Sequence, residues 1–416
     1  MPVDLKIGVY KKMKKVNFTG WPKIIMNRLY RPFQALLLLL SYRNVAWYIY
    51  KRFGARRLIS YIYVTFFVRG EDCGLSILDP VWKLFPFLIP YPPDIELEVT
   101  TFCPLHCKIC ERTYWNRKEG FLNKHMTFEQ FKHIIDQFPN LKWINMTGEG
   151  DAFTNPDIMK MIEYVKKKNV YVVIVHEFFT MNEEMARRLV ELGVERFWIS
   201  FDGATKKTYE SIRVGSDYDR VINNIKLFQR IKKRMNSPIP ELCLRFVFFK
   251  NNYYEMEKYI DLADSLGIKF VNFVGLLEFK QIKGWEYEPS EELINKVNLK
   301  AREKGIKVIW SHASHDPNIK VPLHYCVAFS EPYIFISGDV IPCCALNMLN
   351  KREWLSKRAF GNLFKQHFKD IWNSPRYKKF RRMVVKKDAP VPLFCLGCRA
   401  FDSTKRKVKY GVDYDL

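Results

Sequence analysis

The stretch that decides the fold of this chain is IELEVTTFCPLHCKIC, residues 95–110. Its first half alternates apolar and polar residues and is rich in β-branched side chains, which predicts a strand. Its second half is a short loop that carries Cys103, Cys107 and Cys110 in the spacing C-x3-C-x2-C. Three thiolates on one loop can bind three irons of a 4Fe–4S cube and leave the fourth iron open, whereas a closed structural site uses four protein ligands. A zinc site completed by His106 or by a distant residue is the alternative.

From residue 94 the pattern alternates between short strands and amphipathic helices. The expected strands are Ile95–Thr101, Lys142–Thr147, Val170–Val175, Glu195–Phe201, Leu242–Lys250 and Ile268–Val274. The expected helices are Thr127–Phe138, Pro156–Lys168, Asn182–Leu192, Lys206–Ile212, Tyr218–Lys233 and Tyr254–Leu266. Six β–α repeats predict an α/β fold with a parallel sheet wrapped by helices. Beyond residue 280 the alternation fades, although Val308 suggests one more strand and Tyr333–Val340 a hairpin.

Composition and charge restrict the class of protein. The chain has 416 residues, 48% hydrophobic and 15% aromatic, which excludes a disordered chain and predicts more than one domain. It carries 68 basic and 44 acidic residues, a net charge of +24, and residues 1–70 contain fourteen Lys or Arg with a single acid, Asp4. This excess predicts an acidic partner that contacts mainly the N-terminal segment.

The N-terminal segment contains two apolar runs, Gln34–Leu40 and Leu58–Val68, each too short to span a bilayer. Basic and aromatic residues flank them, as in segments that lie in an anionic membrane surface. A basic helical cap packed on the main domain is the alternative. No cleavable signal peptide is visible, so we expect a cytoplasmic protein that is peripheral on the inner face of the membrane.

Further motifs follow the predicted strands at regular intervals. A glycine- and acid-rich stretch, residues 148–151, follows the second strand, Ser200 and Asp202 end the fourth, and Arg213 follows the next helix. Together with the cysteine loop, this order resembles the radical S-adenosylmethionine (radical SAM) superfamily over about residues 94–400. The resemblance implies a partial (β/α)6 TIM-like barrel, a 4Fe–4S cluster with an open iron, and reductive cleavage of S-adenosylmethionine to a 5′-deoxyadenosyl radical.

The resemblance also implies cofactor-binding roles for individual residues. In the family, the glycine-rich stretch approaches the methionine amino group and an acid accepts a hydrogen bond from it; the matching residues are Gly148, Glu149, Gly150 and Asp151. Asp151 stands where glutamate is usual, with Glu149 as the substitute. Ser200 and Asp202 match family residues that lie near the ribose and the carboxylate of S-adenosylmethionine. Arg213 matches an arginine that commonly points toward the same carboxylate. By local pattern alone, Ser200 and Asp202 could equally end a strand and cap a helix.

A second set of cysteines lies in the last third of the chain. It resembles the C-terminal iron–sulfur extensions called SPASM and twitch, which implies one auxiliary 4Fe–4S cluster on Cys326, Cys343, Cys395 and Cys398. SPASM proper has further cysteines after the C-x2-C pair, and this chain has none, which places it closer to twitch. Cys344 competes with Cys343. A zinc site of four cysteines is the alternative.

The expected domains are an N-terminal module (residues 1–93), the barrel (94–280) and the cluster domain (281–416). Position at the barrel mouth makes four residues weak candidates for substrate chemistry: His176, Glu177, Arg245 and Asn272. Packing is the alternative for His176.

The N-terminal module favours a membrane lipid or isoprenoid-like chain as the substrate whose C–H bond loses hydrogen. The alternatives, in order, are a peptide- or protein-modifying enzyme, a nucleic-acid-modifying enzyme and a non-enzymatic metal-binding protein. Basic residues interleaved with apolar runs suit a bilayer better than a phosphate backbone, which makes nucleic acid the weaker partner. The mechanism implies a low-potential electron donor such as ferredoxin or flavodoxin, and clusters of this kind suit an anaerobic or well-reduced cell.

Overall fold

The computed structural model describes residues 43–66, 91–115, 120–276, 279–311, 331–344, 352–386, 388–396, 407–408 and 411–415. The chain divides into two compact units, residues 1–58 and 59–416. No helix within these described ranges is long and apolar enough to cross a membrane. The apolar run 34–40 and the cysteines at 73, 326 and 398 lie outside them.

In the smaller unit, residues 43–53 form a helix, and Gly54, with φ 83°, separates it from α3 (Ala55–Phe66). Trp47 and Tyr50 are exposed there. The part of α3 that belongs to the larger unit is buried at Tyr61 and Val64, and the Tyr61 ring stacks on Tyr171 with centroids 5.8 Å apart. The second predicted apolar run therefore contributes to packing.

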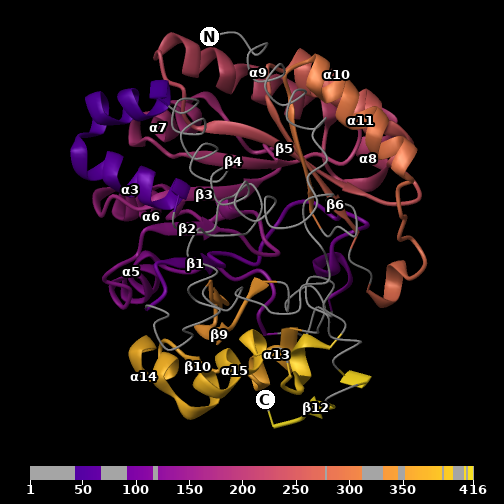
Figure 1. Cartoon of the computed structure of the whole chain (residues 1–416). Coiled ribbons are helices and arrows are strands. Elements are labelled where there is room, and N and C mark those ends of the chain that lie inside the picture. Colours follow the sequence, from indigo (N-terminus) through magenta and orange to yellow (C-terminus); the bar gives the residue numbers. More distant parts are fainter. Residues whose placement is uncertain are drawn as a thin grey trace, which may run out of the picture. The chain divides into compact units, whose positions relative to one another are not determined.

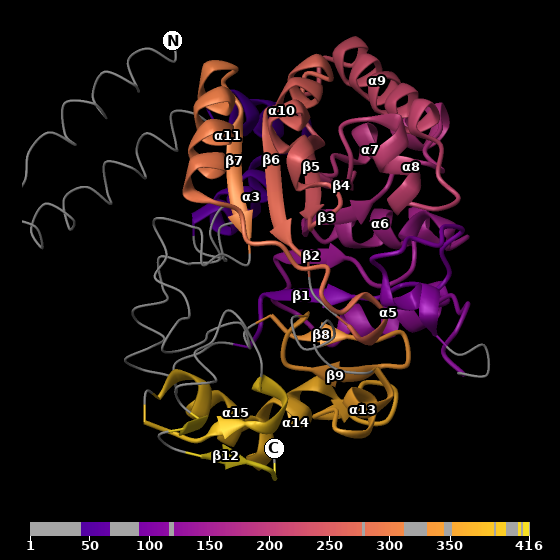
Figure 2. The same ribbon diagram turned by 90° about the vertical axis from the view of Figure 1, so that its right-hand side faces the viewer.

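The larger unit is built on a ten-stranded sheet in the order β10-β9-β8-β1-β2-β3-β4-β5-β6-β7. Strands β1 to β7 are parallel and follow one another in sequence order (Figure 2). Their bounds are β1 Asp94–Leu97, β2 Trp143–Met146, β3 Tyr171–His176, β4 Arg196–Ser200, β5 Glu241–Phe248, β6 Phe270–Gly275 and β7 Lys307–Ser311. The predicted partial barrel is confirmed, and β7, at the position suggested by Val308, extends the six predicted strands to seven.

Helices that alternate with the strands cover the outer face of this sheet (Figure 1). They are α5 Phe128–Asp136, α6 Ile158–Lys167, α7 Glu183–Leu192, α8 Lys206–Ile212, α9 Tyr218–Arg234, α10 Met256–Ser265 and α11 Glu291–Glu303. Short 3-10 helices are η2 Glu111–Tyr114, η3 Ala152–Thr154, η4 Tyr253–Glu255, η5 Lys280–Ile282 and η7 Leu393–Cys395. Thr127 and Gln130 form a capping box at α5, and Gly193 ends α7 in the left-handed conformation. Pro156 lies two residues before α6 instead of at its start.

Side chains alternate between the two faces of each strand. On β5, Leu244, Phe246 and Phe248 belong to the hydrophobic core beneath the helices. Arg245 therefore faces the opposite, inner side, together with its register partners Ser200 on β4 and Asn272 on β6.

The C-terminal segment continues the same sheet. Strand β8 (Tyr333–Ile334) pairs parallel with β1, and β9 (Asp339–Ile341) and β10 (Gly361–Asn362) add antiparallel strands. The β8–β9 turn at Gly338, with φ 83°, confirms the predicted hairpin. Beyond it lie α13 Arg352–Lys357, α14 Phe368–Asn373, α15 Pro375–Val385, and the parallel pair β11 Val391–Pro392 and β12 Val412–Asp413. This segment packs on the barrel through Phe368, whose ring centroid is 4.4 Å from that of Phe138.

Candidate functional site

The cysteine loop follows β1 and is held by hydrogen bonds from its surroundings. The backbone N–H of His106 donates to Val214 O (2.8 Å), and that of Lys108 donates to Ile212 O (2.9 Å) at the end of α8. Within the loop, Cys110 N–H donates to Cys107 O (3.1 Å). These bonds fix the path of the loop, which places three cysteines on one short segment.

The three thiols lie in a desolvated environment. Burial raises the pKa of Cys103 and Cys107, and raises that of Cys110 to about 12. Thiols with such pKa values stay protonated unless a metal stabilises the thiolate, because a coordinating cation removes the proton. A cationic cluster is therefore the partner that would ionise them.

The glycine-rich stretch after β2 packs against the backbone of this loop. A Cβ on Gly150 would lie 2.4 Å from Thr100 O, and one on Gly148 would lie 2.7 Å from Glu98 Cγ. The N–H of Asp151 donates to Phe102 O (2.7 Å). Glycine is thus required at 148 and 150 by the approach of the chain's own first strand and loop.

Asp151, His176 and Glu177 form a buried cluster beside the cysteine loop. Their nearest nitrogen and oxygen atoms all lie within 4.8 Å of one another. Oδ1 of Asp151 accepts the N–H of Phe153 (3.0 Å) and lies 3.2 Å from Nε2 of His176, while Oδ2 accepts the Thr180 hydroxyl (3.3 Å). Both oxygens of Asp151 are thus engaged. The structure places the predicted residues 151, 176 and 177 together.

The hydrogen bonds of His176 argue against a metal ion in this cluster. Its Nδ1 accepts the N–H of Phe178 (3.1 Å), which leaves the proton of the neutral ring on Nε2. A ring that carries its proton on Nε2 cannot coordinate through that atom. Nε2 therefore carries the donor hydrogen, and its near acceptors are Thr180 Oγ1 (3.1 Å) and Asp151 Oδ1 (3.2 Å).

Glu177 differs from Asp151 because its carboxylate oxygens are still available to accept hydrogen bonds. Its carboxylate is buried, and neither oxygen has a hydrogen-bond partner among the described residues, although Oε2 lies 3.3 Å from Nε2 of His176. Burial raises the pKa of Glu177 to about 7. The same carboxylate raises the pKa of Cys103 and Cys107, so it lies on the side of the cysteine loop.

A positive group lies on another side of the loop. Arg213, which follows α8, pairs with Asp202 (Nη2 to Oδ2, 2.6 Å) and directs Nη1 toward Cys107 Sγ at 3.9 Å. Its buried Nε has no hydrogen-bond partner in the described part of the chain. Asp202 also accepts the N–H of Val247 (2.7 Å), so its carboxylate connects β4, β5 and α8.

The two groups with spare hydrogen-bonding capacity, Glu177 and Arg213, have opposite charges. An α-amino acid presents an ammonium and a carboxylate, which are the complements of these two groups. The methionine part of S-adenosylmethionine therefore fits the residues around the cysteine loop. Ser200, at the end of β4, lies two residues before Asp202 and is the register partner of Arg245 on β5.

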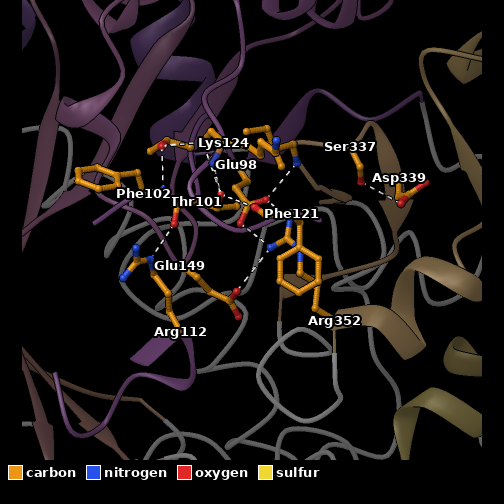
Figure 3. Close-up of polar contacts among 12 residues, drawn as sticks. Glu98, Thr101, Phe102, Arg112, Phe121, Lys124, Glu149, Ser337, Asp339 and Arg352 are labelled. Carbon is orange, nitrogen blue, oxygen red and sulfur yellow. Dashed lines mark hydrogen bonds and ion pairs between the residues drawn. The ribbon is translucent and has the colours of Figure 1, made fainter. Parts of the chain in front are cut away.

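A third ionic group connects the cysteine loop to the C-terminal segment (Figure 3). The guanidinium of Arg352 pairs with the carboxylate of Glu98, one bond being 2.7 Å, and lies 3.5 Å from Oε2 of Glu149. Oε2 of Glu98 also accepts the N–H of Ile336 (3.0 Å). Burial raises the pKa of Glu149 to about 8, with the charge of Arg352 opposing.

The adjacent cysteines 343 and 344 have different neighbours. The charge of Cys343 contributes to the raised pKa of Tyr377 on α15, so it lies near the C-terminal helices. Burial and the charge of Glu96, on the inner face of β1, raise the pKa of Cys344, so this thiol lies on the side of the barrel interior. Cys395 is buried in η7. These surroundings favour Cys343 as the ligand, and its assignment with Cys326, Cys395 and Cys398 stays a prediction.

Comparison with known families agrees with this geometry. The model of the radical SAM superfamily matches residues 97–263, and that of the SPASM iron–sulfur cluster-binding domain matches residues 326–399. The chain is a radical SAM enzyme. Its two domains imply a 4Fe–4S cluster, S-adenosylmethionine and an auxiliary iron–sulfur cluster, and such enzymes need a reductant.

Several characterised proteins resemble this radical SAM enzyme. It is 26% identical over 330 residues to the tungsten-containing aldehyde ferredoxin oxidoreductase cofactor-modifying protein of Pyrococcus furiosus, covering 74% of this chain and 88% of the relative. It is 24% identical over 305 residues to the PqqA peptide cyclase of Granulibacter bethesdensis, covering 70% and 76%. The fold is similar to that of Streptococcus suis SuiB bound to the precursor peptide SuiA, with a TM-score of 0.55, 16% identity, and 77% and 72% coverage.

Sequence reasoning missed the buried ion pair of Glu98 with Arg352. The available signal was the pattern Ile95-Glu-Leu-Glu-Val, which puts two acids on one face of an otherwise apolar strand. Such acids need a partner, but nothing in the sequence identified Arg352, which lies 254 residues away.

Proposed function

We propose that this radical SAM enzyme modifies a peptide. The observation that carries the proposal is that the fold over 77% of this chain is similar to that of SuiB, in a structure that contains the precursor peptide SuiA. A peptide cyclase among the relatives supports it. These similarities favour the peptide alternative over the lipid or isoprenoid substrate that the N-terminal module suggested.

When bound, the cluster and S-adenosylmethionine supply a carbon radical that removes hydrogen from an unactivated C–H bond. We propose that Cys103, Cys107 and Cys110 bind that cluster. Glu177 holds the methionine ammonium and Arg213 the carboxylate, because these buried groups have spare hydrogen-bonding capacity beside the cysteine loop. Asp202 orients Arg213. Gly148, Glu149, Gly150, Asp151 and Ser200 complete the proposed cofactor-binding set.

The substrate class can be tested without knowing the substrate. Cells grown on deuterated medium provide separate peptide, small-molecule and lipid fractions, and each is incubated with reduced enzyme and S-adenosylmethionine. We expect deuterated 5′-deoxyadenosine only with the peptide fraction, since hydrogen comes from the substrate. A Cys107→Ala variant is the control and should release none. Deuterium transfer from the lipid or small-molecule fraction alone would refute the peptide proposal.

A second candidate is modification of a small cofactor. It is favoured by the similarity to a cofactor-modifying protein, which extends over 88% of that relative. Deuterium transfer from the small-molecule fraction would support this candidate.

The metal content provides an independent check. We expect about eight irons per chain from two four-iron clusters. One or two zincs without iron would support a zinc-binding protein instead.

For the partners, we propose a ferredoxin- or flavodoxin-type electron donor and an anionic membrane surface that contacts residues 1–93. Exposed Trp47 and Tyr50, with Lys51 Nζ 4.7 Å from the Trp47 ring centroid, support membrane contact. Flotation with anionic vesicles should be weaker for full-length Trp47→Ala/Tyr50→Ala than for the wild type. Equal flotation, or none, would refute the membrane contact.

A further inference from the structure

One cation on the inner face of the barrel has no role in the site described above. Arg245 on β5 is the register partner of Ser200 and Asn272, and its backbone oxygen accepts the N–H of Phe201 (2.9 Å). Phe201 directly precedes Asp202, which pairs with Arg213 beside Cys107. Arg245 is therefore two strand positions from the proposed cofactor site, on the side that faces the interior of the barrel.

The guanidinium of Arg245 has no counter-ion in the part of the chain that the structure describes. It forms neither an ion pair nor a side-chain hydrogen bond with any of the described residues, and its Nε is completely buried. Its remaining contact is with the Trp198 ring, 5.2 Å from the centroid. Arg245 is half-buried, and a cation whose Nε is removed from water without a hydrogen bond is costly, so the group is available to a ligand.

The acid with the strongest effect on Arg245 is already engaged. Burial lowers the pKa of Arg245, and the charge of Glu96 acts in the opposite direction. These two described side chains nevertheless form no ion pair. Instead, Oε1 of Glu96 accepts a hydrogen bond from Nδ2 of Asn145 (3.1 Å).

The neighbours of Arg245 add further donors. Oδ1 of Asn272 accepts the Ser311 hydroxyl (2.9 Å), so its amide NH₂ group remains as a donor. The Ser200 hydroxyl lies on the other side in the strand register. A guanidinium with an amide NH₂ group on the adjacent strand β6 matches the oxygens of an anion, because a guanidinium can bind a carboxylate or phosphate with two parallel hydrogen bonds.

We propose that Arg245, with Asn272, binds an anionic oxygen group of the substrate, a carboxylate or a phosphate. This site anchors the substrate within the barrel, one strand away from the proposed cofactor site. In a peptide substrate the group would be an acidic side chain or the C-terminal carboxylate. The anion site does not depend on the peptide proposal, because either anion could belong to another class of molecule.

The test uses the reaction of phenylglyoxal with arginine in the wild-type full-length holoenzyme, so no variant has to fold. Mass spectrometry measures the labelling rate at Arg245 with glutarate, inorganic phosphate or uncharged glutaramide present. The matched control is Arg196 on β4, whose guanidinium is paired with Glu241 at 2.5 Å. We expect Arg245 to react with phenylglyoxal in the native enzyme, and one of the two anions to slow its labelling about tenfold. Glutaramide should leave the labelling rate of Arg245 unchanged. The labelling rate of Arg196 should change with none of the three compounds.

Comparing glutarate with phosphate also distinguishes a substrate carboxylate from a substrate phosphate. Stronger protection by glutarate indicates a carboxylate substrate, and stronger protection by phosphate a phosphorylated one. Equal protection by glutaramide, protection by neither anion, or an Arg245 that reacts only after unfolding would overturn the proposal. Anion protection without deuterium transfer from peptides would keep this site and refute the peptide substrate.

Discussion

The guanidinium of Arg352 and the carboxylate of Glu98 form an ion pair in which both side chains are at most 3% exposed. Glu98 lies five residues before Cys103, and Arg352 lies nine residues after Cys343. The pair therefore connects the strand that leads into the first cysteine loop with the segment between Cys343 and Cys395 of the second cysteine set.

Arg352→Met should lower the free energy of unfolding by about 3–5 kcal/mol, because it leaves the charge of Glu98 buried without a partner. The double variant Glu98→Gln/Arg352→Met should recover part of this loss. Anaerobic chemical denaturation of the full chain measures both. Lys357→Met is the control: its pair with Glu353 is exposed, so a change within about 0.5 kcal/mol is expected. Equal losses in the two single variants would contradict the prediction.

Glu177→Gln should weaken binding of S-adenosylmethionine about tenfold or more, because it removes the charge with spare hydrogen-bonding capacity. Equilibrium dialysis of anaerobic, cluster-loaded enzyme measures the dissociation constant. An analogue that lacks the amino group should bind wild type and variant equally. Glu183→Gln, an acid-to-amide change on the exposed start of α7, should have no effect. A larger loss for Asp151→Asn would instead assign the ammonium to Asp151.

Binding of S-adenosylmethionine should depend on pH near neutrality. Burial raises the pKa of Glu177 to about 7, with the charge of Asp151 in the same direction and those of His176 and Arg213 opposing. An acid with a raised pKa is neutral below that pH, so affinity should fall as the pH drops from about 8 to about 6. Dialysis across this range should show the step in wild type and lose it in Glu177→Gln; an identical profile would refute the assignment.

Cys343→Ser should lower the iron content by about four atoms per chain, because we expect this residue to bind the auxiliary cluster. Cys344→Ser should keep the full content, since the pKa of that thiol is raised by burial and by the charge of Glu96 on the barrel side. Iron and sulfide analysis of anaerobically purified protein distinguishes the two. The reverse pattern would show that Cys344 is the ligand.

Much of the barrel could be predicted from local chemistry. The boundaries of α7 follow from Asn182 as the N-cap and Gly193 in the left-handed conformation, and α5 begins at its capping box. The three-cysteine spacing after a strand, together with the motifs that follow the later strands, indicated the cluster loop. These features depend on residues a few positions apart, which is why the sequence shows them.

The remaining features depend on distant contacts. That Glu177 can still accept hydrogen bonds follows only from the hydrogen bonds of Asp151 and His176, which the structure provides. The different surroundings of Cys343 and Cys344 arise because adjacent side chains point in different directions, which their spacing does not reveal. Arg245 could be placed on the inner face by strand alternation, but its lack of a counter-ion could not.

The pairing of β1 with β8 has a consequence for biosynthesis. One edge of β1 is completed by a strand that begins at Tyr333, and the Glu98 carboxylate meets the N–H of Ile336, 238 residues later in the chain. On the ribosome, β1 to β7 can assemble while this edge is still open. An open strand edge can pair with other chains, so the nascent barrel should be prone to aggregation until the cluster domain emerges. The cluster domain would then act as a built-in cover that the barrel receives last.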